Sequence, residues 1–187
     1  MKRIAFVLCI LCLPLAAQAA LVSRMVDYSQ GDTSFKGYMV HDDAKAGKRP
    51  AVLVVHEWWG LNDYIRSRAD QLARMGYVVF APDIFGNGIS TTDPNEAKRL
   101  YGEAAPHVRE RAAAGLDILR KNQLVDPRRI AAIGFCFGGM TVLELAYSGA
   151  DIAGVVTFHG VLTAPKPEDD EALIFLGDPY PGQAKNR

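Results

Sequence analysis

The chain has 187 residues, of which 49% are hydrophobic, and it carries 21 basic and 21 acidic side chains. Its length suits one domain with a sizeable core. The balanced charge gives no reason to expect nucleic acid or an anionic membrane surface as a partner.

The first nineteen residues have the three regions of a secretory signal peptide. Lys2 and Arg3 form a basic start, residues 4–15 form an apolar run too short to span a bilayer comfortably, and "AQA" at 17–19 is a small-residue cleavage pattern. We therefore expect cleavage after Ala19, export to the periplasm or the medium, and no contact with the membrane after cleavage. A retained membrane anchor is the alternative.

Cleavage would leave one domain over residues 20–187 with a single cysteine. This mature chain has 168 residues, with 19 basic and 21 acidic side chains, because the signal takes away two basic residues. Cys9 and Cys12 leave as well, so Cys136 has no partner for an internal disulfide in an oxidising compartment. Cys136 is therefore either a buried small apolar side chain or a reactive thiol with a function.

Strand and helix patterns alternate along the mature chain. Alternating side chains around a Gly-Asp turn predict a hairpin over 23–42. The order of the later elements predicts an α/β fold with a mostly parallel sheet and helices on both faces. Apolar runs predict strands, helical spacing predicts helices and turn residues predict loops as follows: strands 51–57, 77–83, 129–135, 152–160 and 172–177; helices 62–76, 96–122 (one or two, with a break near Pro106) and 138–149; loops 84–95 and 163–171.

The stretch "GFCFGG" places Cys136 directly after a predicted strand and before a predicted helix, in the pattern G-x-C-x-G. Gly134 and Gly138 permit the sharp turn and close packing of a nucleophile elbow. The helix that follows points its N-terminus at the sulfur, which stabilises a thiolate. The elbow also leaves the backbone N–H of Phe137 free to bind an oxyanion. This context favours Cys136 as a nucleophile.

The loop "VVHEWWGLND" follows another predicted parallel strand, where sites gather in open α/β sheets. In this architecture the loop supplies a second oxyanion donor, here the backbone N–H of Trp58. Glu57 is placed to interact with the resting thiol, or else it is an ordinary surface carboxylate. Trp58 and Trp59 either pack under the loop or line a substrate pocket.

Four stretches in this order and spacing, "HEWWGLNDYIR", "YVVFAPDIFG", "IAAIGFCFGG" and "VVTFHG", resemble the dienelactone hydrolase family, and more narrowly its exported bacterial members. The resemblance runs from about residue 24 to residue 178. It implies an α/β-hydrolase fold and a Cys-His-Asp triad that acts on esters or lactones. It also implies that a glutamate at the position of Glu57 holds the resting thiol.

Carried onto this chain, the resemblance assigns Cys136 and Glu57 directly and makes Asp178 in "LGDPY" the acid of the triad. The segment around Asp178 is shorter than in the family, and a plain turn aspartate before Pro179 is the alternative. Asn87 lies nearest to the place where the family's enzyme for dienelactone uses an arginine to hold a carboxylate. The resemblance therefore does not extend to a preference for carboxylated lactones.

None of the four histidines follows Asp178, although the triad order of the family requires one there. His159 ends a predicted strand near the site and is expected to line the substrate pocket, with Trp59 and Asn87. His56 lies on the loop before Trp58, but its family role is not that of the triad base. We therefore expect a member of the family that is truncated at its C-terminus and lacks the last helix and strand of the fold.

Two functions remain open. The first is hydrolysis of an ester or lactone bond of a small molecule through a cysteine nucleophile and a thioester intermediate. The alternative is a truncated, catalytically impaired or non-catalytic remnant that binds a ligand without turnover. No cofactor is expected and no metal, because "HEWWG" lacks the second histidine of H-E-x-x-H. The pattern leaves substrate identity and oligomeric state undetermined.

Overall fold

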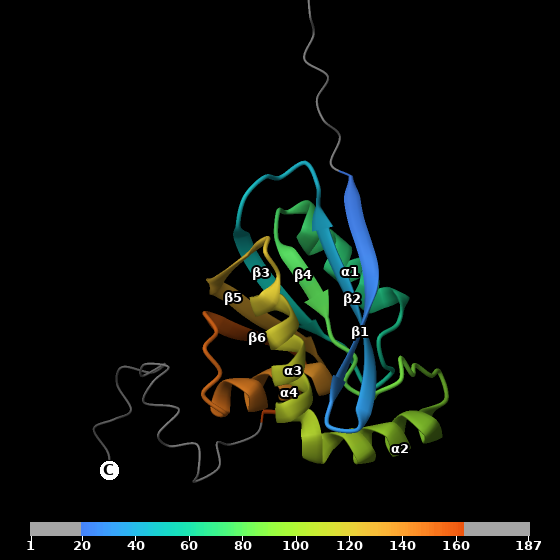
Figure 1. The fold of residues 1–187 in the computed structure, drawn as a ribbon. Helices are drawn as coiled ribbons and strands as arrows, with labels where there is room; N and C mark the ends of the chain where they lie inside the picture. Colours follow the sequence, from blue (N-terminus) through green and yellow to red (C-terminus); the bar gives the residue numbers. More distant parts are fainter. Residues whose placement is uncertain (1–19, 163–187) are drawn as a thin grey trace, which may run out of the picture.

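The computed structural model describes residues 20–162 (Figure 1). The predicted signal peptide, the loop 163–171, the strand 172–177 and Asp178 therefore lie outside the described residues. The elements in chain order are β1 (Leu21–Gln30), β2 (Thr33–Asp42), β3 (Arg49–Val55), α1 (Asp63–Arg74), β4 (Val78–Ala81), α2 (Pro94–Ala104), the 3-10 turn η1 (Ala105–His107), α3 (Val108–Lys121), β5 (Val125–Phe135), α4 (Phe137–Tyr147) and β6 (Gly154–Phe158).

The strands form one sheet in the order β1-β2-β4-β3-β5-β6. The pairs β3–β4, β3–β5 and β5–β6 are parallel, whereas the hairpin β1–β2 is antiparallel and joins the sheet through an antiparallel β2–β4 pair. The prediction of a mostly parallel sheet is thus confirmed, with two antiparallel strands at one edge. Because parallel strands end at the same side of a sheet, the segments after β3, β4, β5 and β6 gather there.

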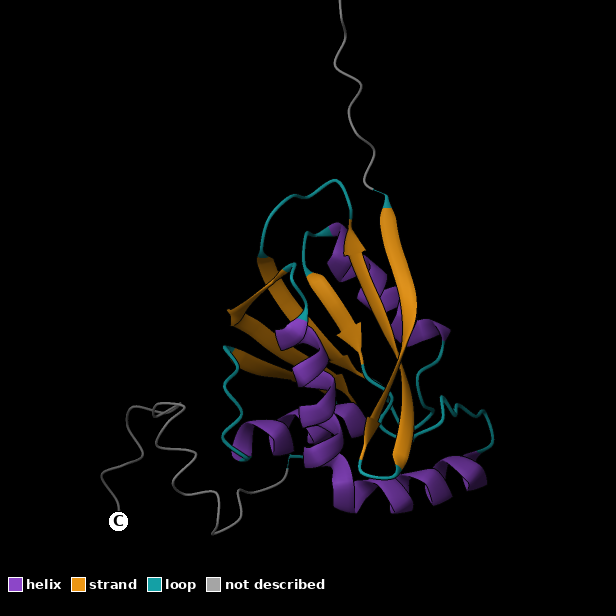
Figure 2. Cartoon of the chain, viewed as in Figure 1, coloured by secondary structure: helices purple, strands orange, loops and turns teal. Residues whose placement is uncertain are grey.

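Helices cover both faces of the sheet, as expected. Figures 1 and 2 show α3 and α4 in front of the sheet and α1 behind it. Since successive side chains of a strand point to opposite faces, β3 contributes to both cores. The core under α1 includes Val52, Val54, Ile65, Ala69 and Ala73, and the core under α3 and α4 includes Leu53, Val55, Leu116, Leu119 and Leu145.

One predicted break is confirmed, and the boundaries of β4 and β5 differ from the predictions for local reasons. The expected break at Pro106 is present as η1, which separates α2 from α3. β4 ends at Ala81 rather than at 83, because Pro82 has no N–H for the ladder and the Asp83 carboxylate binds the amides of the loop that follows. β5 begins at Val125, four residues before the predicted 129, with a register shift opposite Arg49 and Ala51.

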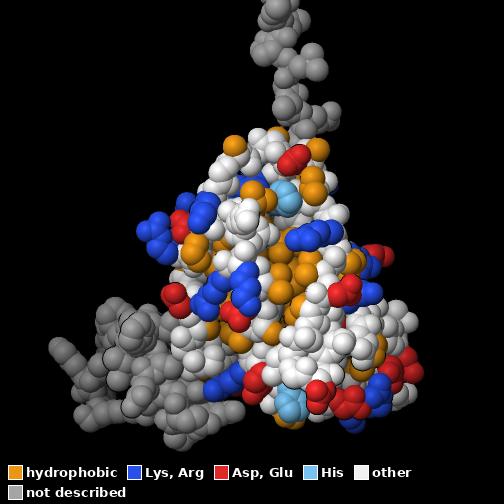
Figure 3. Space-filling view, viewed as in Figure 1, with side chains coloured by type: hydrophobic (Ala, Val, Ile, Leu, Met, Phe, Trp, Pro, Cys, Tyr) orange, Lys and Arg blue, Asp and Glu red, His pale blue; other side chains and the backbone are white. Residues whose placement is uncertain are grey.

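The face seen in Figure 3 mixes acidic and basic side chains, with hydrophobic side chains exposed between them. A hollow of about 520 Å³ between β1, β2 and the end of α3 includes Val26, Met39, Ile118 and Leu124 in its lining. Within residues 20–162, the helices are too short and too polar for any of them to cross a bilayer.

Candidate active site

The ends of three neighbouring strands bring most of the predicted site residues together. In the sheet order β3-β5-β6, Glu57 and Trp58 follow β3, Cys136 and Phe137 follow β5, and His159 follows β6. Sequence reasoning placed these residues at strand ends, and the strand order makes them neighbours.

Cys136 occupies a tight turn between β5 and α4. Its φ is +52° and its ψ is −113°, a backbone conformation that residues other than glycine rarely adopt. A Cβ atom at Gly134 would overlap the carbonyl oxygen of Gly138, and a Cβ at Gly138 would overlap the carbonyl oxygen of Val55. The two glycines therefore let α4 start directly against β3 and β5, which holds Cys136 at the apex of the turn.

Phe137 is the first residue of α4, so its N–H has no acceptor within the helix. This N–H lies at the N-terminal end of α4, where the helix dipole is positive. The Phe137 ring is buried and centred 5.7 Å from Phe85, 5.2 Å from Tyr101 and 6.2 Å from His56. This aromatic cluster fixes the backbone of Phe137, and with it the direction of its amide.

His56 is fully buried, and both of its ring nitrogens are engaged. Nε2 accepts a hydrogen bond from the N–H of Ile84 at 3.0 Å, so the ring proton lies on Nδ1, which donates to the carbonyl oxygen of Glu57. Burial lowers the pKa of His56 and keeps the ring neutral. His56 therefore orients the loop that carries Glu57 and is not free to act as a base for Cys136.

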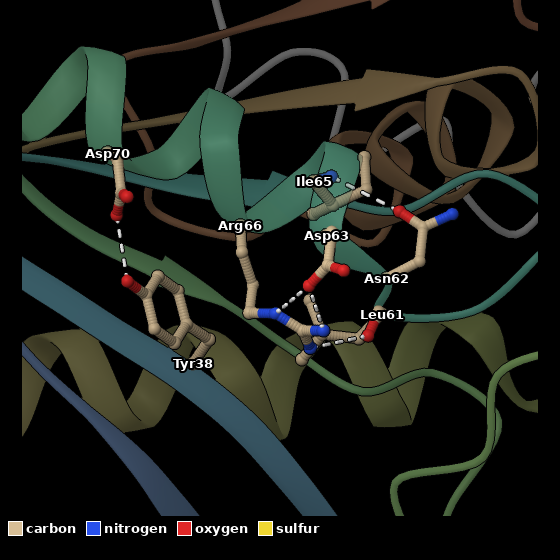
Figure 4. A network of polar contacts seen from close by, with 7 residues as sticks. All are labelled: Tyr38, Leu61, Asn62, Asp63, Ile65, Arg66 and Asp70. Atoms are coloured by element: carbon tan, nitrogen blue, oxygen red, sulfur yellow. Dashed lines mark hydrogen bonds and ion pairs between the residues drawn. The ribbon is translucent and has the colours of Figure 1, made fainter.

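A second set of contacts fixes the far end of the same loop (Figure 4). The Asn62 side chain caps α1 by accepting from the N–H of Ile65 at 3.2 Å. Arg66 reaches back to the carbonyl oxygen of Leu61 at 3.0 Å and pairs with Asp63 at 2.6 Å. The segment from Glu57 to Asn62 is thus held at both ends.

Asp83 is a structural residue of the site that the sequence analysis did not single out. Its buried carboxylate accepts from the N–H groups of Phe85, Gly86, Gly88 and Lys36 at 2.7–3.2 Å. These bonds shape the loop after β4, whose Ile84 amide in turn holds His56. The signal available in the sequence was an aspartate after a proline at the end of an apolar strand.

The predicted substrate-binding residues occupy different surroundings. Trp58 packs against the core under α3 and α4 and against Trp59, with ring centres 4.9 Å apart. Trp59 lines a hollow of about 570 Å³, together with Asn62, Ser90, Thr91 and Thr92. Asn87 is exposed, with a φ of +54° and its N–H bonded to Ser34, which accounts for an asparagine in that turn. A role of Asn87 in substrate binding stays a prediction.

His159 lies at the mouth of the site. Its side chain is 61% exposed, and its Nε2 lies 3.9 Å from Oε1 of Glu57. On its other side His159 borders an apolar hollow of about 390 Å³ between α1 and the strands β5 and β6, which Phe135 and Phe158 also line.

Within residues 20–162, no three His, Cys, Asp or Glu side chains are grouped in a way that would hold a metal ion. His41 lies on β2, which β4 and β3 separate from β5, and His107 lies in η1. Of the predicted triad, the structure therefore describes Cys136, and Asp178 falls outside it.

The comparisons with known proteins include a family model that matches most of the chain. The model of the dienelactone hydrolase family matches residues 35–175. Protein Usf of Aquifex pyrophilus is 28% identical over 165 residues, which cover 83% of this chain and 70% of Usf. The solved structure of m3DLH superposes with a TM-score of 0.77 at 42% identity and covers 82% of this chain.

A second solved structure has a similar likeness. It is the dienelactone hydrolase-like promiscuous phosphotriesterase P91 from metagenomic libraries, with a TM-score of 0.75, 41% identity and 80% of this chain covered. The match spans 65% of the m3DLH chain and 64% of the P91 chain, so this chain corresponds to about two thirds of each. Because the family model covers most of the chain, this chain belongs to the dienelactone hydrolase family.

Proposed function

We propose that this chain cleaves an ester or lactone bond of a small molecule with Cys136 as the nucleophile. The observation that carries the proposal is the strained turn at Cys136, with a φ of +52° between β5 and α4. Such strain persists only where the surrounding structure enforces it, and it clusters at functional sites. A cysteine with only a packing role does not require a backbone conformation with a positive φ.

In the proposed reaction the Cys136 thiolate attacks the carbonyl carbon of the substrate. The negative charge that develops on the carbonyl oxygen is stabilised by the N–H of Phe137 at the start of α4 and by the N–H of Trp58. Collapse of this intermediate breaks the bond to the alcohol oxygen, which takes up a proton and leaves. Cys136 is then held as a thioester, and attack by water releases the acid and restores the thiol.

The test compares Cys136→Ala with the wild type in hydrolysis of p-nitrophenyl acetate. We expect the variant to lose on the order of 10³-fold or more in kcat/KM, because no second group replaces the nucleophile. Ser67→Ala, at an exposed position of α1, is the matched control and should keep full activity. Mass spectrometry of the wild type quenched during turnover should show an acetyl group on the peptide that contains Cys136. Full activity of Cys136→Ala would rule the proposal out.

A ligand-binding protein without turnover is the second candidate, because both ring nitrogens of His56 are engaged and this histidine is not free to act as a base for Cys136. It predicts that Cys136 is acylated once by the ester and that no further product follows. A burst of p-nitrophenol equal to the protein concentration, with no steady release after it, distinguishes this outcome from catalysis.

We also propose that the chain is exported and cleaved after Ala19. β1 begins at Leu21, so removal of residues 1–19 leaves every described helix and strand intact. The intact mass of the protein isolated from its source cells tests both this cleavage and the C-terminus. A mass that matches residues 20–187 supports export of the chain as it stands, and a mass that retains residues 1–19 contradicts it.

A further inference from the structure

The side chains of Glu57 and His159 meet across a strand that lies between them. Glu57 follows β3, His159 follows β6, and β5 with Cys136 at its end separates the two strands. Neighbouring strands are about 4.8 Å apart, so the ends of β3 and β6 are separated by roughly 10 Å. The carboxylate and the imidazole nevertheless approach to 3.9 Å. The two side chains therefore reach toward each other over the end of β5, where Cys136 lies.

The turn that carries Cys136 is in contact with both flanking strand ends. The N–H of Cys136 donates to the carbonyl oxygen of Phe158 at 2.9 Å. Gly138, two residues further on, lies so close to Val55 and His56 that a Cβ atom there would overlap their carbonyl oxygens. The residues that directly precede His159 and Glu57 are thus fixed against the elbow.

The backbone of His159 is itself held in an unfavourable conformation. Its φ is +45°, and with Cys136 and Asn87 it is one of three residues other than glycine with a positive φ in the described part of the chain. Gly160 packs against Gly139 of α4, where a Cβ atom would come within 2.8 Å of Cα. Close packing of Gly160 on the first turn of α4 restricts the backbone next to His159, whose Nε2 lies 3.9 Å from Glu57.

We propose that His159 is a positioning residue for the chemistry of Cys136 and that it acts through Glu57. When it is protonated, His159 holds the Glu57 carboxylate and offsets its negative charge, so that a second negative charge can form on the sulfur of Cys136. Ionisation of the thiol then releases one proton to the solvent and changes no other bond. The inference rests on the proposed cysteine chemistry, because it concerns the reactivity of the same thiol.

Among residues 20–162, α1 places two further charged or titratable groups beside His159. Tyr64 and Arg68 line the same hollow as His159. The Arg68 guanidinium lies 4.9 Å above the Tyr64 ring and donates to Gln71 at 3.0 Å. A guanidinium keeps its charge throughout the neutral range, so Arg68 adds a constant field and does not produce a change between pH 5 and pH 8.

The experiment measures the rate at which iodoacetamide alkylates Cys136 in the full chain between pH 5 and pH 9, quantified by mass spectrometry of the Cys136 peptide. The key variant is His159→Asn, because asparagine tolerates a positive φ. We expect alkylation at pH 7 to slow about tenfold and the midpoint of the pH profile to rise by about one unit. His159→Lys keeps a positive charge and should restore most of the rate. His41→Gln, on β2, is the control and should leave the profile unchanged.

A double-variant cycle tests whether His159 acts through Glu57. Glu57→Gln should speed alkylation at pH 7, and addition of His159→Asn to that background should change the rate by less than about twofold. An unchanged profile in His159→Asn, or an equal effect of that substitution in both backgrounds, overturns the proposal. Alkylation requires no ester hydrolysis, so these outcomes are independent of the Cys136→Ala activity test.

Discussion

The His56 ring joins the loop after β3 to a residue 28 positions further along the chain, through its bonds to Glu57 and Ile84. The ring is wholly buried and the Asp83 carboxylate lies nearby, but burial is the dominant effect and lowers the pKa of His56. A neutral imidazole suits this place because it offers one donor and one acceptor at fixed directions.

The depressed pKa of His56 predicts a loss of stability in mild acid. In the unfolded chain the ring takes up a proton as the pH falls through its ordinary value of 6.5, whereas in the folded protein it resists protonation. The contribution is therefore fully present above that value and is lost as the pH falls below it. The free energy of unfolding in urea should decline between pH 7 and pH 5, and His56→Gln, which does not titrate, should flatten that decline. His41→Gln measures the share of His41, whose pKa partial burial also lowers.

Removal of the hydrogen-bonding groups of His56 should be far more damaging than removal of its charge. His56→Leu leaves the Ile84 N–H and the Glu57 carbonyl oxygen without their partner in the core. Each such orphan costs roughly 1–3 kcal/mol, so we expect the free energy of unfolding at pH 7 to fall by about 2–6 kcal/mol. His56→Gln should lose less, since glutamine also carries a donor and an acceptor. Equal stability of the two variants would mean that the bonds contribute little.

At the scale of elements, the start of α4 requires glycine, whereas the last turn of α2 does not. Gly138 allows the first turn of α4 to contact the carbonyl oxygens of Val55 and His56, whereas Gly102 has open space around its Cα. Gly138→Ala should therefore reduce stability by about 2 kcal/mol or more and displace Cys136. Gly102→Ala should raise stability by about 0.5–1 kcal/mol, because alanine favours a helix interior. Thermal unfolding of both variants, beside the alkylation rate of Cys136, checks the contrast.

The elements themselves were largely predictable because their signals are local. Period-two and period-3.6 patterns indicated the hairpin and the helices, and Gly134 and Gly138 indicated the elbow. The hydrogen bonds of Asp83 were not predictable, since bonds between a side chain and backbone amides give no periodic pattern in the sequence. The approach of Glu57 to His159 was not predictable either, because it depends on β4 lying on the other side of β3, so that β5 and β6 follow β3 directly in the sheet.

At the scale of the whole molecule, the two edges of the described sheet differ in charge. β1 carries Arg24 and Asp27, and Asp27 lies 3.6 Å from the Lys36 ammonium. β6 carries the sequence "GVVTF", with no charge, and within residues 20–162 no strand lies on its outer side. Charged side chains on an edge discourage pairing with another chain, and β6 has none. With equal numbers of basic and acidic residues overall, charge repulsion between molecules is weak as well.

If no strand from outside residues 20–162 pairs with β6, this asymmetry predicts that the protein associates through the β6 side. Val156 on β6 and Val22 on β1 are comparably exposed, at 50% and 42%, so lysine at either place should cost little stability. If β6 is the contact, Val156→Lys should weaken concentration-dependent association at least several-fold in sedimentation velocity, and Val22→Lys should weaken it much less. Equal effects of the two substitutions would assign association to general charge repulsion. A wild type that stays monomeric at every concentration would show that the β6 edge is covered in solution.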